Sequence, residues 1–102
     1  MSGYILKAAG LPVTHVLDWG RGYLAPREVV LRDLGWTVQA VGEGAAPLVV
    51  TEQGHDARRS WAVFEGGAPG RVYMVASRVR TSEDRVLSRA IIIRIALGMR
   101  PQ

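Results

Sequence analysis

The sequence predicts an all-β sandwich, and three of its features lead to that prediction. The dominant period of the apolar side chains is two rather than 3.6, as along Val72–Arg80. The apolar runs are short and are separated by glycine, proline and charged residues, which is typical of strands joined by turns. The 102 residues are 48% hydrophobic and include no cysteine, so packing without disulfide bonds must hold the fold. A chain of this length has room for one core, and we therefore expect a single domain over residues 1–102.

Seven strands are expected, a number that fits a sandwich. In chain order they are Val13–Trp19, Glu28–Leu31, Trp36–Val41, Pro47–Glu52, Arg59–Glu65, Val72–Arg80 and Val86–Leu97. Turn chemistry separates them, as "GRG" at 20–22, "GEGAAP" at 42–47, "EQGHDA" at 52–57, "GGAPG" at 66–70 and "TSED" at 81–84.

The segment "APREVVLRDLG" has a helical alternative. Pro26 suits a first helical position and Gly35 suits a helix stop. Against a helix stand the β-branched Val29 and Val30 and the lack of a clean 3.6-residue stripe, which favour a strand with a bend.

The last two predicted strands each have one face that should be buried. On the first, the core-facing set is Tyr73, Val75, Ser77 and Val79, and the opposite set is Met74, Ala76, Arg78 and Arg80. On the second, Ile91, Ile93, Ile95 and Leu97 alternate with Ala90, Ile92, Arg94 and Ala96. The two strands can pair as a hairpin through "TSED", with Asp84 in the left-handed conformation.

The joint before Val72–Arg80 holds Gly66, Gly67 and Gly70 beside Pro69, so we expect at least one of these glycines to adopt a positive φ. Tyr73 follows this joint as the tyrosine corner does in immunoglobulin-like sandwiches, where the hydroxyl bonds to upstream backbone. The predicted sandwich is therefore immunoglobulin-like. Trp36 and Tyr73 are expected in the core, whereas Trp61 could lie on either face of Arg59–Glu65.

Basic charge is concentrated in the second half, where residues 52–102 carry nine basic and five acidic side chains within a net charge of +4. Twelve of the thirteen basic residues are arginine, whose planar fork suits carboxylates and phosphates. A solvated face, a protein interface and a nucleic-acid-binding module are all open interpretations. Exposed rings beside the basic residues, which a single-strand binder needs, are not expected. Because the outer sides of the last two strands mix apolar and basic residues, we predict a protein interface made of Met74, Arg78, Arg80, Ile92 and Arg94.

No catalytic, cofactor or metal motif is evident, and we expect no enzyme. Ser60, His55 and Asp56 are the residue types of a hydrolase triad, but no nucleophile-elbow motif accompanies them. His15 and His55 are too few for a metal site and are expected at the surface or a strand edge. "GEGAAP" lacks the third glycine of a dinucleotide loop.

Two segments bear on location. The start, "MSGYILKAAG", does not have the pattern of a secretory signal, so we expect a protein made in the cytoplasm. The run Ala90–Leu97 is interrupted by Arg94 and is far shorter than the roughly 20 residues of a membrane span.

The order of several motifs resembles a family of small phage proteins, the phage fiber-tail adaptors of short-tailed phages. These motifs are "VLDW" (16–19), "YLAPREVV" (23–30), "GWTV" (35–38), "GGAPG" (66–70), "YMVASRVRT" (73–81) and "RAIIIRI" (89–95). The chain departs from the family pattern at Tyr23, where a second tryptophan is frequent, at Ser77, where Asn is frequent, and at Asp84, where a turn glycine is usual.

The resemblance implies an immunoglobulin-like fold and a structural role. The protein would be a virion subunit, made in the bacterial host cytoplasm and present in multiple copies, that joins tail fibers to the tail or neck. Its partners would be tail or neck subunits and tail fibers. The nucleic-acid-binding β module is the alternative function.

Overall fold

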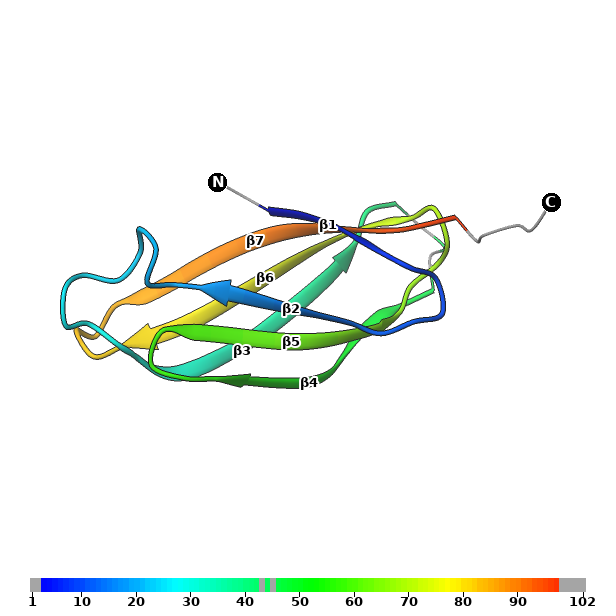
Figure 1. Ribbon diagram of the computed structural model, residues 1–102. Helices are drawn as coiled ribbons and strands as arrows, with labels where there is room; N and C mark the ends of the chain where they lie inside the picture. Colours follow the sequence, from blue (N-terminus) through cyan, green and yellow to red (C-terminus); the bar gives the residue numbers. More distant parts are fainter. Residues whose placement is uncertain (1–2, 43, 45, 98–102) are drawn as a thin grey trace.

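The computed structural model describes residues 3–42, 44 and 46–97, and within them all regular structure is β-strand (Figure 1). The strands are β1 (Gly3–Lys7), β2 (Val13–Asp18), β3 (Val30–Ala40), β4 (Leu48–His55), β5 (Arg59–Gly66), β6 (Val72–Thr81) and β7 (Val86–Ile95). They form two sheets, sheet A in the order β1-β7-β6-β3 and sheet B in the order β2-β5-β4. The buried apolar side chains of both sheets make one core, so the predicted all-β sandwich is confirmed. No helix in the described ranges could cross a membrane.

The order of six of the strands can be compared with that of an immunoglobulin sandwich. Strands β2-β5-β4 correspond to B-E-D of an immunoglobulin sandwich, and β7-β6-β3 correspond to G-F-C. Strand β1 lies at the edge of sheet A, parallel to β7, whereas the other neighbouring strands are antiparallel.

Two of the predicted strands were wrong, and β4 continues to His55, past its predicted end at Glu52 and into the predicted turn 52–57. Glu28–Leu31 and Trp36–Val41 are not separate strands, because β3 runs unbroken from Val30 to Ala40 and no helix forms there. Two register shifts, between Val30 and Arg32 and between Asp33 and Gly35, carry β3 through the residues that separate the two predicted strands. Strand β1 was missed altogether, because its short apolar run becomes a strand only by pairing with β7. Glu43 and Ala45 of the predicted turn 42–47 lie outside the described residues.

The core lies between the sheets, and the positions of two side chains differ from expectation. Trp19, treated only as the end of a strand, is fully buried, and its indole N–H donates to Ser60 Oγ at 2.9 Å. Ser60 Oγ also lies 3.3 Å from Ser77 Oγ of the opposite sheet, so this polar cluster is satisfied internally. Leu97 was predicted to be buried but is 71% exposed, since it lies beyond the end of β7.

The other two tryptophans differ in orientation: Trp36 lies on the inner side of sheet A and Trp61 on the outer side of sheet B. Trp36 is half-buried and packs edge-on against Phe64, with the ring centroids 5.5 Å apart, as expected of a residue at the core. Ala62 and Phe64 are fully buried, so Trp61, which alternates with them along β5, lies on the outer side of sheet B.

The glycine joint and the β6–β7 hairpin follow the prediction closely. Gly66, Gly67 and Gly70 all have positive φ, at 87°, 89° and 78°. β6 and β7 are antiparallel partners, and Asp84 in their turn has a φ of 60°, in the left-handed region.

The Tyr73 hydroxyl makes the upstream bonds expected of a tyrosine corner. It accepts a hydrogen bond from the Ala68 N–H at 2.8 Å and donates one to the Ala46 carbonyl at 2.5 Å, while the ring is fully buried. Tyr73 therefore ties β6 to the β5–β6 joint and to the segment before β4.

Replacing Tyr73 with phenylalanine should lower the free energy of unfolding by about 1–2 kcal/mol, because both backbone groups lose their partner while the ring still fills its site. The denaturant midpoint measures this change. Tyr4→Phe is the control, since the Tyr4 side chain is largely exposed and should leave the midpoint unchanged. Equal midpoints for Tyr73→Phe and the wild type would show that the hydrogen bonds of the Tyr73 hydroxyl do not stabilise the fold.

Gly66→Ala should be more destabilising than Gly22→Ala, although the two glycines have nearly the same φ, 87° and 88°. Both variants incur the left-handed cost of a Cβ, about 1–2 kcal/mol. At Gly66 the new Cβ would also lie 2.7 Å from the Pro47 carbonyl oxygen, whereas at Gly22 it would meet nothing within 4 Å. We expect an additional loss of at least about 1 kcal/mol at Gly66 in chemical unfolding, and equal losses would contradict the clash.

Candidate functional site

The outer face of sheet A is the surface formed by the outward side chains of β1, β7, β6 and β3. The strand register places Tyr4, Ile92, Met74 and Gln39 in one row across this face. The next row toward one end of the sandwich contains Leu6, Arg94 and Val72. All five side chains of the predicted interface, Met74, Arg78, Arg80, Ile92 and Arg94, therefore share this face, on the side away from Tyr73 and Ile93.

One end of the outer face of sheet A is largely apolar, with Arg94 as its one charged side chain in the rows described above. Tyr4 and Leu6 are 61% and 60% exposed, and Met74 between β7 and β3 is 45% exposed. Ile92 is half-buried among them. Tyr4 and Leu6 were not predicted as interface residues, because the signal for β1 depends on its pairing with β7.

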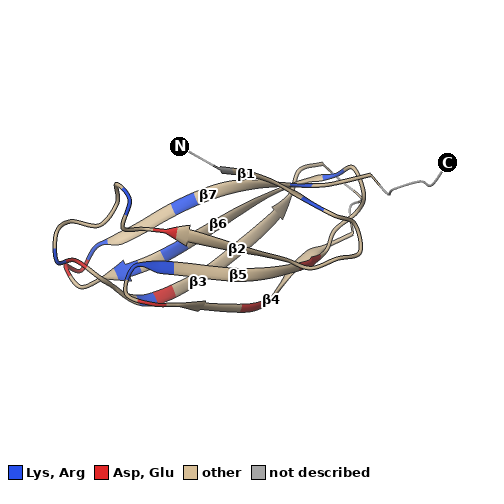
Figure 2. Ribbon diagram, viewed as in Figure 1, with Lys and Arg blue, Asp and Glu red and all other residues tan. Residues whose placement is uncertain are grey.

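The other end is basic. Arg32 on β3 stands directly across from Arg80 on β6, and Arg78 is two residues further along β6. Arg80 pairs with the exposed Asp84 at 2.7 Å, while the other two have no acidic partner within the described residues. Figure 2 shows the blue segments of sheet A together with a red segment on β3, where Asp33 pairs with the inward-facing Val79 and accepts a hydrogen bond from the Gly35 N–H. In the described residues, the outward positions that the register assigns to β1, β6 and β7 carry no acidic side chain. The face thus has a strongly positive character.

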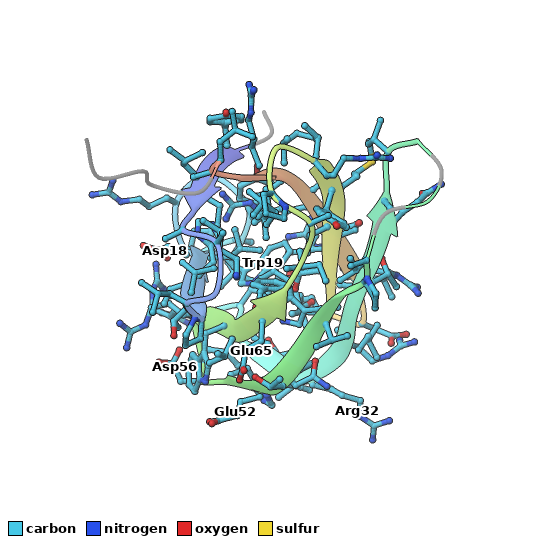
Figure 3. All side chains as sticks on the ribbon, turned by 90° about the vertical axis from the view of Figure 1, so that its right-hand side faces the viewer. Asp18, Trp19, Arg32, Glu52, Asp56 and Glu65 are labelled. Carbon is cyan, nitrogen blue, oxygen red and sulfur yellow. The ribbon has the colours of Figure 1, made fainter. Side chains whose placement is uncertain are left out.

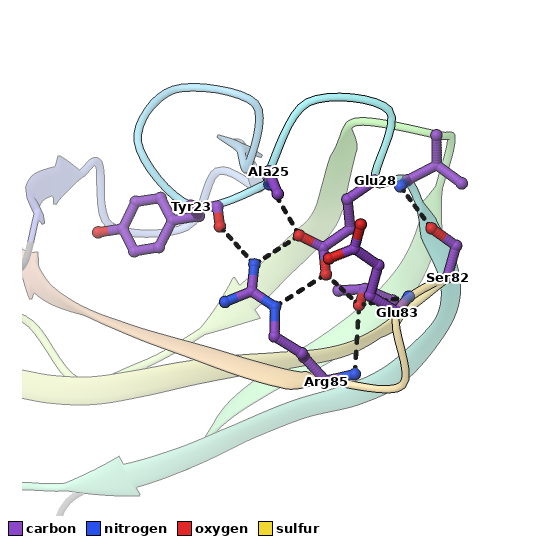
Figure 4. Close-up of polar contacts among 8 residues, drawn as sticks. Tyr23, Ala25, Glu28, Ser82, Glu83 and Arg85 are labelled. Carbon is purple, nitrogen blue, oxygen red and sulfur yellow. Dashed lines mark hydrogen bonds and ion pairs between the residues drawn. The ribbon is translucent and has the colours of Figure 1, made fainter.

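A buried carboxylate holds the β6–β7 turn, next to this basic end. Glu28 is fully buried, and Arg85 donates to both of its oxygens, from Nη2 to Oε1 at 2.5 Å and from Nε to Oε2 at 2.9 Å (Figure 4). The Ala25 N–H donates to Oε1 at 2.8 Å, and the Thr81 hydroxyl donates to Oε2. Arg85 Nη2 also reaches the Tyr23 carbonyl at 2.9 Å. This Glu28–Arg85 clamp joins the β2–β3 loop to the hairpin, and nothing in the sequence indicated it, since Glu28 was only the first residue of a predicted strand.

The surroundings of Glu28 change its proton affinity. The hydrogen bonds from Arg85 lower the pKa of the Glu28 carboxyl from 4.5 to about 2, with support from the Ala25 N–H and the Thr81 hydroxyl and against the opposing effect of burial. The folded protein therefore favours the ionised carboxylate of Glu28 over its protonated form.

A second arginine braces the start of the same loop. The Arg89 guanidinium lies 4.4 Å from the Tyr23 ring centroid and 5.4 Å from that of Trp19, and its Nη1 donates to the Asp18 carbonyl at 2.9 Å. Arg85 and Arg89 thus serve the fold itself, a role that none of the three interpretations of the arginines included. Tyr23, where the family pattern often has tryptophan, is one of the rings that Arg89 contacts.

Ser60 and Asp56, two of the residue types of a hydrolase triad, make hydrogen bonds to other residues. The Ser60 hydroxyl lies between Trp19 and Ser77, and Asp56 accepts hydrogen bonds from the Arg58 N–H and from Arg59. Those bonds, the Arg58 N–H foremost, lower the pKa of Asp56 to about 2. An open cleft of about 460 Å³ adjoins this turn, lined by Asp18, Asp56, Ala57, Arg58 and Arg59.

The histidines lie on edge strands, as expected. His15 is half-buried on β2, and burial together with Arg89 lowers its pKa. His55 is exposed at the end of β4. In the described part of the chain, no three His, Asp or Glu side chains lie close enough together to hold a metal ion.

Comparison with known proteins adds one match. The family model described as "Podophage GP4 fiber-tail adaptor protein gp77" matches residues 7–94, which extend from the end of β1 almost to the end of β7. No curated protein matched the chain.

The Glu28–Arg85 clamp should give the fold an acid-sensitive contribution. Because the folded pKa is lowered to about 2, the contribution is complete above the unfolded pKa near 4.5 and is lost as the pH falls toward 2. Glu28→Gln should therefore be less stable than the wild type at pH 7, and the difference should shrink between about pH 4.5 and pH 2.

Chemical unfolding at a series of pH values measures that difference. Glu83→Gln is the matched control, because Glu83 is exposed in the adjoining turn and its carboxylate accepts no hydrogen bond within the described residues. A gap between the wild type and Glu28→Gln that stays constant from pH 7 to pH 2 would contradict the clamp.

Proposed function

Since the chain belongs to the podophage GP4 fiber-tail adaptor family, we propose that it works as a virion tail subunit whose outer face of sheet A docks against a neighbouring virion protein. The adaptor function is that of the family, as the sequence motifs predicted. The proposal adds the contact surface and the chemistry of the contact.

The observation that carries the proposal is the composition of the outer face of sheet A. Tyr, Met and Arg are enriched at protein interfaces, and this face presents Tyr4, Met74 and Arg78 on one continuous sheet. The apolar end offers area to remove from water, and the basic end offers the guanidinium groups of Arg32 and Arg78, which lack acidic partners in the described part of the chain. The complementary surface would therefore have an apolar part and carboxylates opposite the arginines.

The adaptor family implies contacts with tail and fiber proteins, and these are the partners we propose. We further propose that the protein is made in the host cytoplasm and is present in several copies in each particle. A catalytic step is not part of the proposal, and neither is a cofactor. Nucleic-acid binding is not favoured, because Tyr4, the exposed ring of this face, lies at the apolar end and not beside Arg32, Arg78 and Arg80.

A reconstruction of the phage particle that contains this protein should show the outer face of sheet A covered by another virion chain. The contact should bury at least roughly 1,000 Å² in total, the size expected of a specific interface. Arg78 and Arg94 should lie opposite carboxylates of the covering chain. If every copy presented this face to open solvent, the assignment of the surface would be overturned.

A further inference from the structure

The outer face of sheet B is the surface formed by the outward side chains of β2, β5 and β4, on the opposite side of the sandwich. The register places Val16, Trp61 and Gly54 in one row across it. The next row contains Thr14, Val63 and Glu52, and Glu65 stands across from Val49 beyond that.

The centre of the outer face of sheet B is apolar and contains a tryptophan. The Trp61 indole lies across the backbone of Gly54, where an added Cβ would be 2.9 Å from the ring. Val16 on the neighbouring strand is 49% exposed, and Val63 is half-buried. Tryptophan is among the residues that dominate binding energy at interfaces, so this row is a suitable centre for a contact.

The charge of this face is negative. Glu52 and Glu65 are exposed and have no ion-pair partner within the described residues. Arg59, the basic residue that points outward here, is paired with Asp56 at 2.8 Å. Figure 3 shows Glu52, Glu65, Asp56 and Asp18 on the sheet B side of the molecule. The two broad faces of the sandwich therefore have opposite charge.

The two faces also match in pattern. On β7, Arg94 is two residues from Ile92, and on β5, Val63, the cross-strand partner of Glu52, is two residues from Trp61. On each face, then, a row that contains one charged side chain, Arg94 or Glu52, lies about 7 Å from a row without charge.

We propose that the partner of the outer face of sheet A is the outer face of sheet B of a second copy of this chain. This inference rests on the proposed function and specifies its neighbouring subunit. The contact is head-to-tail, because two sheet A faces would oppose arginine with arginine, whereas sheet A against sheet B pairs arginine with glutamate. Such a contact repeats from copy to copy and builds a ring or a stack, as the angle between copies dictates.

Sedimentation velocity of the full chain at low salt, up to about 1 mM, tests the inference. The average sedimentation coefficient of the wild type should rise with concentration, and added salt should reverse the rise. Arg78→Glu with Arg94→Glu makes both faces acidic, and Glu52→Arg with Glu65→Arg makes both faces basic. Each double variant alone should associate at least about tenfold more weakly than the wild type, because like charges then face each other.

An equal mixture of the two double variants should recover the association, since acidic and basic faces can alternate again. Arg21→Glu with Arg27→Glu is the control, because both arginines are exposed in the β2–β3 loop, and it changes the net charge as the acidic variant does. It should associate as the wild type does. Circular dichroism and thermal unfolding establish that every variant is folded.

A wild type that stays monomeric at all concentrations, or a mixture that does not associate, would overturn the inference. The particle reconstruction tests the proposed function separately from this inference. If the particle shows the outer face of sheet A covered by a different virion protein, the proposed function stands and the inference of a second copy falls.

Discussion

The alternation of side chains along β6 is the constraint on which the rest of the structure depends. β6 lies between β7 and β3, and Tyr73, Val75, Ser77 and Val79 are all buried on its inner side. Because successive side chains of a strand point to opposite faces, burial of these residues places Met74, Arg78 and Arg80 on the outer side. A shift of one residue would put two arginines into the core, so the fold and the candidate surface are determined by the same register.

Other arginines of this chain stabilise the fold. Arg85 holds the buried Glu28 carboxylate, and Arg89 lies against Trp19 and Tyr23, so both fasten the long β2–β3 loop to residues of sheet A and its hairpin. The planar guanidinium suits both tasks, because it donates two parallel hydrogen bonds to a carboxylate and stacks on rings. These two clamps lie at one end of the sandwich and leave the broad faces available. Arg32, Arg78, Arg80 and Arg94, in contrast, lie on the outer face of sheet A.

An adaptor must contact at least two neighbours, and a sandwich offers two broad faces for that purpose. In this chain the faces differ: one combines Tyr4 and Met74 with arginines, and the other combines Trp61 and Val16 with glutamates. Neither face resembles a uniformly solvated surface, because each has exposed apolar side chains, Tyr4 and Met74 on one and Val16 on the other. Opposite charge on the two faces favours association in one orientation and disfavours the symmetric alternatives.

Local sequence pattern was sufficient to predict part of the fold and of the candidate surface. The period of two predicted the all-β class, the buried sides of β6 and β7 and the common face of Met74, Arg78, Arg80, Ile92 and Arg94, because each of these depends on neighbours in the sequence. The positive φ of Gly66, Gly67 and Gly70 and of Asp84 also followed from residue type. Tertiary structure alone decided the rest. β1, with Tyr4 and Leu6, exists through parallel pairing with β7, and β3 continues through two bulges because β6 pairs with both of its halves. Glu28 is buried because Thr81 and Arg85, more than fifty residues away, surround its carboxylate. Such long-range partners leave no periodic signal in the sequence, which is why these features could not be predicted from it.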